Sequence, residues 1–301
     1  MIASFLDSWE LFQFMYLSGW LLAFLLSILG VLVVARDQIF IGVAVSQAST
    51  FGIALGLRLI PATGLSQVAG FHPDAFLSCM AVAFAMLAAL LTARRQTVGQ
   101  GNGHGHESHE ALTGWVFLCA SSVAILLVAH SPHGLEEIQR LLSSSLIGAT
   151  AFDVWLFGGL CAVALLTVVS LRRQVMLFAL DPSMMTAVGM RAVWWTFGVA
   201  AWLGLLVGVS MRVSGLLYTF GHLVLPALIA KNLCQEVRML FCVAPVIAVG
   251  TSILGFVMAN HLDYPPAQMT VALLSLALVL TWGKGLRQRR AMSPIPQAEL
   301  R

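Results

Sequence analysis

Four hydrogen-bonding side chains interrupt an apolar run at residues 39–60: Ser46, Gln47, Ser49 and Thr50. On a helix, Ser46, Gln47 and Thr50 share one face, because residues three and four positions apart lie side by side. Polar groups in the middle of a membrane span are costly unless they face a partner helix or a water-filled cavity. These side chains therefore either hydrogen-bond to a neighbouring helix or line a polar pathway.

A histidine, His222, occupies a similar position in a later apolar run, one turn before Pro226. A proline within a helix frees a backbone carbonyl about one turn upstream, close to this histidine. Imidazole is a good ligand for divalent transition metals, whereas a neutral amide is a poor one. Either the histidine bonds to a neighbouring helix, or it forms a weak metal site with oxygen ligands from the earlier run. The candidate ligands in the second interpretation are His222, Gln47, Ser46 and Thr50.

The composition indicates a membrane protein. Of the 301 residues, 59% are hydrophobic and only 10% are charged, against about 25% charged residues in soluble domains. Apolar runs of about 20 residues can cross a bilayer as helices. The sequence therefore predicts an all-α, polytopic helical bundle of about eight or nine spans in a single transmembrane domain embedded in lipid. The predicted spans are residues 15–35, 39–60, 74–93, 114–131, 152–171, 193–211, 215–231, 239–259 and 267–283.

Lysine and arginine are distributed unevenly between the two sides of these spans. With the amino end outside, only Arg58, Arg140 and Arg212 of the 16 basic residues fall on the outer side. Cytoplasmic loops of membrane proteins carry an excess of basic residues. We therefore expect an outside amino end, an odd number of spans and a cytoplasmic tail at residues 284–301. The net charge of +3 follows from this topology and does not indicate a nucleic-acid partner.

A polar, glycine-rich segment at residues 97–114 separates the third and fourth predicted spans. The sequence predicts a flexible cytoplasmic linker here. Its imidazoles either bind a transition metal weakly, as a sensor or buffer, or are simply polar residues of a loop. The histidines concerned are His104, His106 and His109.

In a second cytoplasmic segment, residues 172–192, the sequence predicts a short helix. Asp181 can cap this helix, Pro182 suits its first position, and Gly189 can end it in a left-handed conformation. Its methionines suit docking into a groove on a partner, although an ordinary connecting helix is an alternative. The methionines expected on the exposed face are Met184, Met185 and Met190.

Four stretches occur in the same order as in a known family. They are GVAVSQASTFG, LFALDPSMMTAVGM, SGLLYTFGHLVLPALIAK and GTSILGFVMANHLDYPPAQ. Together they resemble the permease subunit of ATP-binding-cassette importers for zinc, manganese and iron, over residues 21–282. The matching positions include Gly42, Ser46, Gly52, Asp181, Pro182, Gly189, Gly215, Pro226, Ser252, Gly255, Asp263 and Pro265.

The first stretch departs from the family pattern at three positions. Val43, Gln47 and Phe51 stand where the family has aspartate, histidine and proline. In the relatives the aspartate and the histidine are natural metal ligands in the pathway. Two hypotheses follow from their loss. Either His222 supplies the missing imidazole, or the pathway passes a metal chelate or a different small solute.

The resemblance also implies partners. It implies a second permease copy across a central pathway, cytoplasmic ATPase subunits that dock on residues 181–189, and an extracytoplasmic solute-binding protein. It places the chain in the cytoplasmic membrane of a bacterium. The sequence contains no Gly-x-x-x-x-Gly-Lys-Ser/Thr motif, so we expect ATP on the partner subunit, no cofactor on this chain and no enzymatic activity of its own. A secondary metal transporter with a histidine-rich sensor loop, and a channel or scaffold component, are the alternatives.

The outer loops carry further histidines and an aspartate. These residues either gather around an outer mouth that attracts cations or meets the binding protein, or are simply polar loop residues. The family match of Asp263 implies a structural or gating role. The outer residues are His72, His130, His133, His261 and Asp263.

Overall fold

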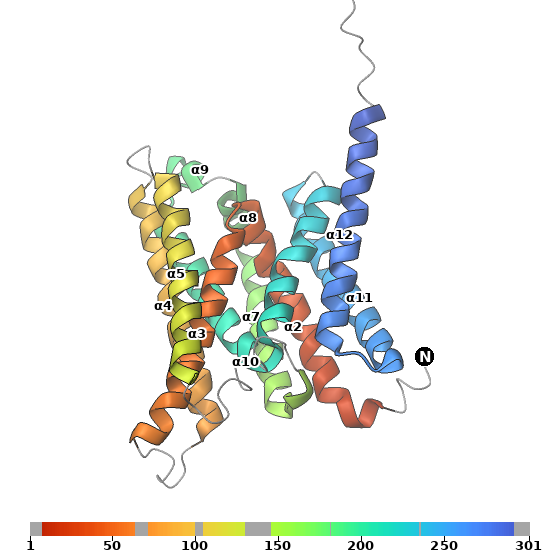
Figure 1. Cartoon of the computed structure of the whole chain (residues 1–301). Helices are drawn as coiled ribbons and strands as arrows, with labels where there is room; N and C mark the ends of the chain where they lie inside the picture. The colour runs from red at the N-terminus through yellow and green to blue at the C-terminus, as the bar shows by residue number, and fades with distance from the viewer. Residues whose placement is uncertain are drawn as a thin grey trace, which may run out of the picture.

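The computed structural model describes residues 8–63, 72–99, 105–129, 146–180, 182–234 and 236–291, and the regular structure in these ranges is helical. The elements form one bundle of long helices with two short helices at one end (Figure 1). Their bounds are α2 (Trp9–Ala35), α3 (Ile39–Thr63), α4 (Pro73–Gly99), α5 (Gly105–Val128), the 3₁₀ helix η2 (Leu146–Gly148), α7 (Ala151–Ser170), α8 (Arg172–Leu180), α9 (Pro182–Ala187), α10 (Ala192–Leu233), α11 (Val237–Leu262) and α12 (Pro266–Ala291).

Eight of the described helices are long and apolar enough to cross a membrane. The 42-residue α10 contains two of the predicted spans, 193–211 and 215–231. Gly215 divides it with φ 70° and ψ −179°, a conformation that is open essentially only to glycine. In Figure 1, α10 runs from the end that carries α9 to the opposite end and then back. One glycine thus replaces the loop expected between the two spans.

Three helices extend into segments that were predicted to be polar and irregular. α4 continues to Gly99 and α5 begins at Gly105, so most of the predicted linker at 97–114 is helical and only residues 100–104 lie outside the described ranges. α12 continues to Ala291, beyond the predicted start of the tail at residue 284. Helical hydrogen bonds are satisfied within the chain, so a helix can extend past its apolar part into water.

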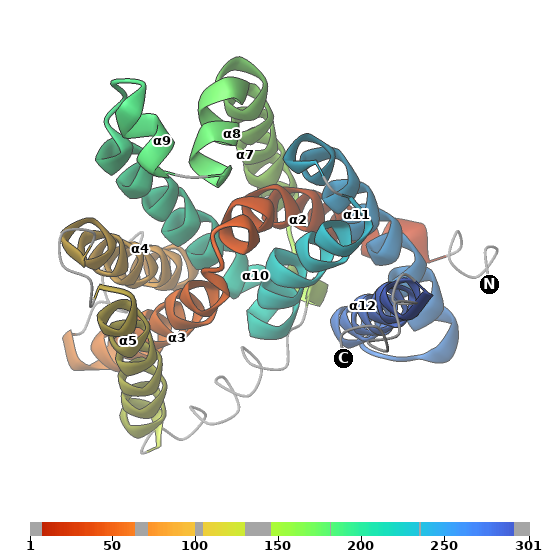
Figure 2. The same cartoon turned by 90° about the horizontal axis from the view of Figure 1, so that it is seen from above.

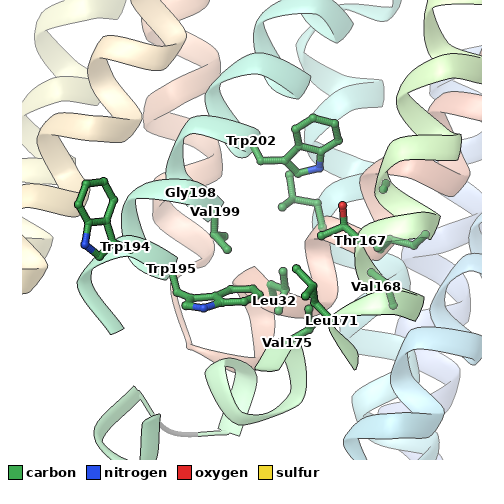
Figure 3. Close-up of a pocket in the computed structure, with 13 residues that line it drawn as sticks. Leu32, Thr167, Val168, Leu171, Val175, Trp194, Trp195, Gly198, Val199 and Trp202 are labelled. Carbon is green, nitrogen blue, oxygen red and sulfur yellow. The ribbon is translucent and has the colours of Figure 1, made fainter. Parts of the chain in front are cut away.

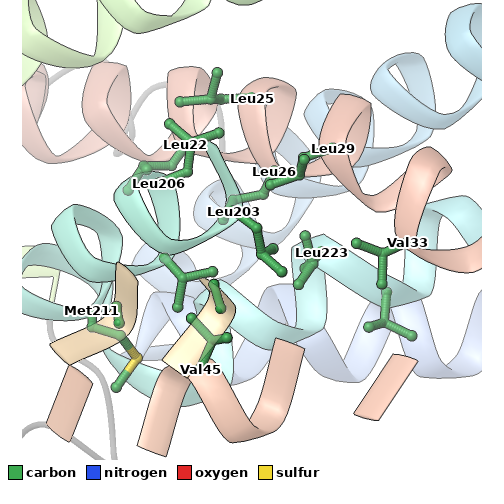
Figure 4. Close-up of a cluster of buried hydrophobic side chains, with 14 of the residues drawn as sticks. Leu22, Leu25, Leu26, Leu29, Val33, Val45, Leu203, Leu206, Met211 and Leu223 are labelled. Carbon is green, nitrogen blue, oxygen red and sulfur yellow. The ribbon is translucent and has the colours of Figure 1, made fainter. Parts of the chain in front are cut away.

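α2 and α10 lie at the centre of the bundle when it is seen from above (Figure 2). Leucines of α2, among them Leu22 and Leu26, pack against Leu203 and Leu206 in the first half of α10 (Figure 4). Leu223 in the second half of α10 packs in the same cluster. Both halves of α10 are therefore held against the same central helix.

Small residues bring α4 close to the first half of α10. Gly204 and Gly208 are four positions apart and face the α4 backbone at Met86 and Val82. A Cβ atom at either glycine would lie 2.6 Å from the Cα atom of the facing residue. Glycines at this spacing let two helix backbones approach closely, which is the usual way that helices pack in membranes.

One end of the bundle is rich in basic residues, and we call it the basic end. It carries α8 and α9, together with the ends of α2, α4 and α10 and the starts of α10 and α11 (Figure 1). The basic residues at these helix ends are Arg36, Arg94, Arg172, Arg173, Arg191, Lys231 and Arg238. α2 begins at the opposite end of the bundle and α12 ends at the basic end.

Candidate functional site

The polar face of α3 is buried inside the chain. The Ser46 hydroxyl donates to the Gly42 carbonyl at 2.8 Å, and the Thr50 hydroxyl donates to the Ser46 carbonyl at 3.2 Å. Both bonds stay within α3, as serine and threonine often do in helices. Gln47 is also buried, and the Ser49 hydroxyl has no hydrogen-bond partner among the described residues. Among the described residues, the hydroxyls of Ser46 and Thr50 therefore do not connect α3 to a neighbouring helix.

His222 lies at the junction of three central helices. Its side chain is 0% exposed, its Nδ1 atom is 3.1 Å from the Tyr218 carbonyl oxygen, and the two rings are 3.9 Å apart. The Tyr218 hydroxyl donates to the Gly19 carbonyl at 2.8 Å and lies 2.8 Å from the Ser252 hydroxyl. This network joins α2, α10 and α11. The Nε2 atom of His222 is buried and has no partner within the described part of the chain.

His222 and the polar residues of α3 lie on different sides of the second half of α10. This half meets α3 through Phe220 and Leu223, which pack against Gly42. His222 instead shares the face of Tyr218, which points toward α2 and α11. Among the described residues, no group of three or more His, Cys, Asp or Glu side chains is placed to hold a metal ion.

An ion pair near the kink in α10 was not foreseen from the sequence. Arg212 Nη2 lies 2.8 Å from Asp153 Oδ1, and the aspartate side chain is only 1% exposed. Asp153 also accepts hydrogen bonds from the backbone and hydroxyl of Thr150, both at 2.8 Å, so it closes a capping box at the start of α7. The sequence Thr150-Ala-Phe-Asp153 has the capping-box spacing, but nothing local to it indicates the arginine 59 positions away.

The short helix predicted at residues 182–189 is present as α9. It begins at Pro182, and Gly189 follows it in the left-handed region at φ 81°. The Met190 N–H donates to the Met185 carbonyl at 2.9 Å, which completes the turn that ends the helix. Asp181, the predicted cap, lies outside the described residues.

The exposure predicted for the methionines is partly wrong. Met184 is 55% exposed as expected, but Met185 is 0% exposed and Met190 is half-buried. α9 packs on α8 and α10, so the helix has an inner face that its own sequence does not indicate. Val188, one turn after Met184, is also an exposed apolar residue, as is Leu180 at the end of α8.

α8 also contacts the turn between α2 and α3. The guanidinium carbon of Arg36 lies 4.4 Å from the ring centroid of Phe178, which is fully buried. The same ring lies 6.1 Å from the ring of Trp195 at the start of α10. Asp37, the next residue of the turn after Arg36, forms an exposed ion pair with Lys231 at 3.1 Å. Phe178 therefore joins α8, α10 and the residue that follows α2.

The remaining histidines are spread over the chain. His104, His130 and His133 lie outside the described residues, and His106 and His109 belong to the first turns of α5. The two exposed outer histidines, His72 before α4 and His261 in the last turn of α11, lie at the end opposite the basic end. α4 and α11 stand on opposite sides of the bundle in Figures 1 and 2, so one chain does not gather these two residues around a mouth.

Asp263, the acidic residue of the outer set, follows α11 with φ 54° in the left-handed region. The N–H of Tyr264 donates to the Ala259 carbonyl at 3.0 Å, so this turn ends the helix. An aspartate tolerates the left-handed conformation better than most other residues. Asp263 therefore occupies the turn that ends α11, and the structural or gating role expected for it stays a prediction.

Residues 8–284 match the ABC 3 transport family. The chain belongs to this family. This chain is 22% identical over 167 residues to the chelated iron transport system membrane protein YfeD of Yersinia pestis. The match covers 54% of this chain and 56% of YfeD. The chain is 19% identical to the manganese import system permease protein ScaB of Streptococcus gordonii over 86% of each chain. Its fold is similar to a chain of PsaBC from Streptococcus pneumoniae in complex with Fab, with a TM-score of 0.75, 18% identity and coverage of 94% of this chain and 95% of that chain.

The family match confirms the resemblance stated from the sequence, and the TM-score confirms the all-α membrane bundle. This chain matches YfeD over about 56% of the length of YfeD. The relatives are membrane proteins of bacterial transport systems, which agrees with a multi-pass protein of a bacterial inner membrane.

Proposed function

We propose that this chain is the permease subunit of an importer that moves a divalent transition metal, as the ion or as a chelate, and that a separate ATPase subunit energises it. The observation that carries the proposal is the position of α9. In a chain of the ABC 3 transport family, a short helix with an exposed apolar face stands outside the spans at one end of the bundle. Such a helix offers a partner a compact surface for docking.

The proposed orientation follows from charge. Because basic residues favour the cytoplasmic side, the basic end faces the cytoplasm, the amino end is outside and α12 ends in the cytoplasm. The ATPase subunits then dock on Met184, Val188 and Leu180 and bind the ATP, while this chain binds no cofactor. A solute-binding protein delivers the cargo at the opposite end, and a second copy of the chain completes the pathway.

Coupling between the ATPase and the pathway is proposed to pass through buried contacts. Met185 fixes the inner face of α9 in the core shared with α8 and α10. Phe178 then connects α8 to Arg36, the residue after α2. The turn from α2 to α3 is short and tightly bonded, with the Gln38 N–H donating to the Val33 carbonyl at 2.9 Å. A displacement of α9 can therefore reach α3, which carries the polar face, without passing through a flexible loop.

The cargo is proposed to be a manganese, iron or zinc ion, or a chelate of one. ScaB is named for manganese and YfeD for chelated iron, which supports this class. The chelate has specific support from the site, because Val43 and Gln47 offer α3 no charged ligand. A chelated metal already has its ligands and needs only a polar passage, whereas a bare divalent ion must exchange its waters for protein ligands.

The test is reconstitution of this chain with a candidate ATP-binding-cassette ATPase subunit from the same organism. The wild-type chain should co-purify with a stoichiometric ATPase and import metal into liposomes only when that subunit and ATP are present. Met184→Asp should reduce ATPase binding at least tenfold, because it places a charge in an apolar contact. Leu262→Asp, at an exposed leucine of the opposite end, is the matched control and should leave binding unchanged. Active transport by the chain alone would refute the proposal.

A further inference from the structure

An apolar groove of about 370 Å³ opens between α7 and the first half of α10. α2 lines it through Ile28, Leu29 and Leu32, and α8 borders it through Val175. Figure 3 shows Trp195 and Trp202 of α10 on one side of the opening, with side chains of α2, α7 and α8 across from them. The volume lies within the range of about 300–1,000 Å³ that is usual for small-molecule sites.

Apart from the indole N–H groups of Trp194, Trp195 and Trp202, the lining is almost entirely hydrocarbon, with Thr167 as its one hydroxyl side chain. The hydroxyl of Thr167 donates to the Val163 carbonyl at 2.8 Å, so it is satisfied within α7. Gly198 leaves the middle of the α10 side without a side chain, and no described atom lies within 4 Å of a Cβ placed there. The space therefore suits a flexible hydrocarbon and not a polar solute.

The surroundings of the groove indicate that it opens toward lipid. α2, α7 and α10 are all candidate membrane spans. The side chains of Leu166 and Val169 on α7 and of Trp194 on α10 are each more than 60% exposed. Apolar side chains this exposed on a membrane span face acyl chains, so the natural occupant of a groove between them is an acyl chain.

Basic residues mark one end of the groove. Arg36 follows α2 one turn beyond Leu32, Arg172 opens α8, and Arg191 immediately precedes α10. Trp195 lies one turn into α10, at the depth where tryptophan side chains collect beside lipid headgroups. Arginines beside a crevice between spans attract acidic lipid headgroups. The charge at this end therefore complements a phosphate.

We propose that the groove binds one acyl chain of an acidic phospholipid from the leaflet at the basic end, with the lipid phosphate beside Arg191. The groove lining includes none of the polar α3 residues of the proposed pathway, so the proposal does not depend on which cargo the chain carries. A lipid held there fills the space between α7 and α10 that no described helix covers, and so supports the position of α8 and α9.

The test uses the full-length chain in detergent with phosphatidylglycerol or phosphatidylcholine of identical acyl chains, and counts bound lipids by native mass spectrometry. The wild-type chain should retain phosphatidylglycerol in preference to phosphatidylcholine. Gly198→Leu fills the groove and should reduce retention of phosphatidylglycerol at least tenfold. Gly159→Leu is the matched control: Gly159 is an exposed glycine of α7 outside the groove lining, and no described atom lies within 4 Å of its Cβ position. This control should retain lipid like the wild type.

Two further variants keep the test decisive. Thr167→Phe fills the groove from α7 and replaces Gly198→Leu if that variant does not fold. Arg191→Gln should lower the retention of phosphatidylglycerol to that of phosphatidylcholine, because the groove remains while the headgroup contact is lost. Equal retention by the groove-filling variants and the Gly159→Leu control would overturn the proposal, because lipid would then bind as a non-selective shell. A disulfide between two copies of a Gly198→Cys variant would overturn it in favour of a protein occupant.

Discussion

The close packing of α4 against α10 gives the most direct test of the fold. In Gly208→Ala, the new Cβ atom would lie 2.6 Å from the Cα atom of Val82. Carbon atoms in van der Waals contact are about 3.5–4.0 Å apart. The neighbouring atom belongs to the backbone, so no side-chain rotation can relieve the overlap. The two helices must therefore move apart by about 1 Å along the line that joins these atoms.

The expected cost is that of overpacking a well-packed core, about 1–3 kcal/mol. An opposing term comes from helix propensity, because alanine is better than glycine in a helix by about 0.8–1.0 kcal/mol in water. We expect a net destabilisation of Gly208→Ala of up to about 2 kcal/mol after this offset, and of about 1–3 kcal/mol relative to a glycine-to-alanine substitution in open space. A double substitution with Gly204→Ala should be worse, since both glycines contact the same helix.

The assay is thermal unfolding of the full-length chain in one detergent, followed by tryptophan fluorescence and by the monodisperse fraction on size exclusion. Gly198→Ala is the matched control in the same helix, because no described atom lies within 4 Å of its Cβ position. It should unfold at the wild-type temperature or slightly above it. A Gly208→Ala variant as stable as this control would show that α4 and α10 do not pack as closely as described here.

Three other substitutions test separate contacts. Asp153→Asn removes the charge that lies 2.8 Å from the partly exposed Arg212 guanidinium. It should lower the free energy of unfolding by about 1–3 kcal/mol, less than the loss of one partner of a fully buried ion pair. An unchanged unfolding temperature in the same assay would contradict this. Phe178→Leu should lower the metal transported per ATP at least fivefold, while ATPase binding is kept. Asp37→Asn breaks only an exposed ion pair and should have no effect. Equal metal transport per ATP in both variants would exclude the route through Arg36. His222→Ala tests the hypothesis that this histidine is a metal ligand: because His222 lies on the other side of α10 from the polar face of α3, metal uptake per folded protein should be kept, and loss of uptake with assembly intact would identify a ligand.

The predicted spans agree well with the helices, because a long apolar segment in lipid has no alternative to a helix. The short helix α9 was also predictable, since proline at its first position and glycine after its end act locally. The Gly204-x-x-x-Gly208 spacing is visible in the sequence and indicates close helix packing, but it does not identify α4 as the partner. Local signals thus predicted where the apolar spans and α9 lie, and not how far α4, α5 and α12 extend or which elements meet.

In the candidate site too, the sequence indicated which residues are unusual but not which residues they contact. The sequence singled out His222 and Gln47 as polar residues in apolar runs, and the structure places both in the interior. Their separation on two sides of α10 depends on how that helix is rotated against its neighbours, which single-residue chemistry does not specify. The burial of Met185 depends in the same way on the packing of α9 against α8 and α10.

By itself, the sequence determined that this chain is a multi-span helical membrane protein, which end of it is basic, and where a short helix outside the spans begins and ends. These properties follow from hydrophobicity, charge and turn chemistry, which act within about 20 residues of chain. Only the tertiary structure decided that Arg212 meets Asp153, that Phe178 meets Arg36, and that an apolar groove remains between α7 and α10. In each case residues distant in the chain are brought together by helix packing, and the free energy of that packing is shared among many contacts.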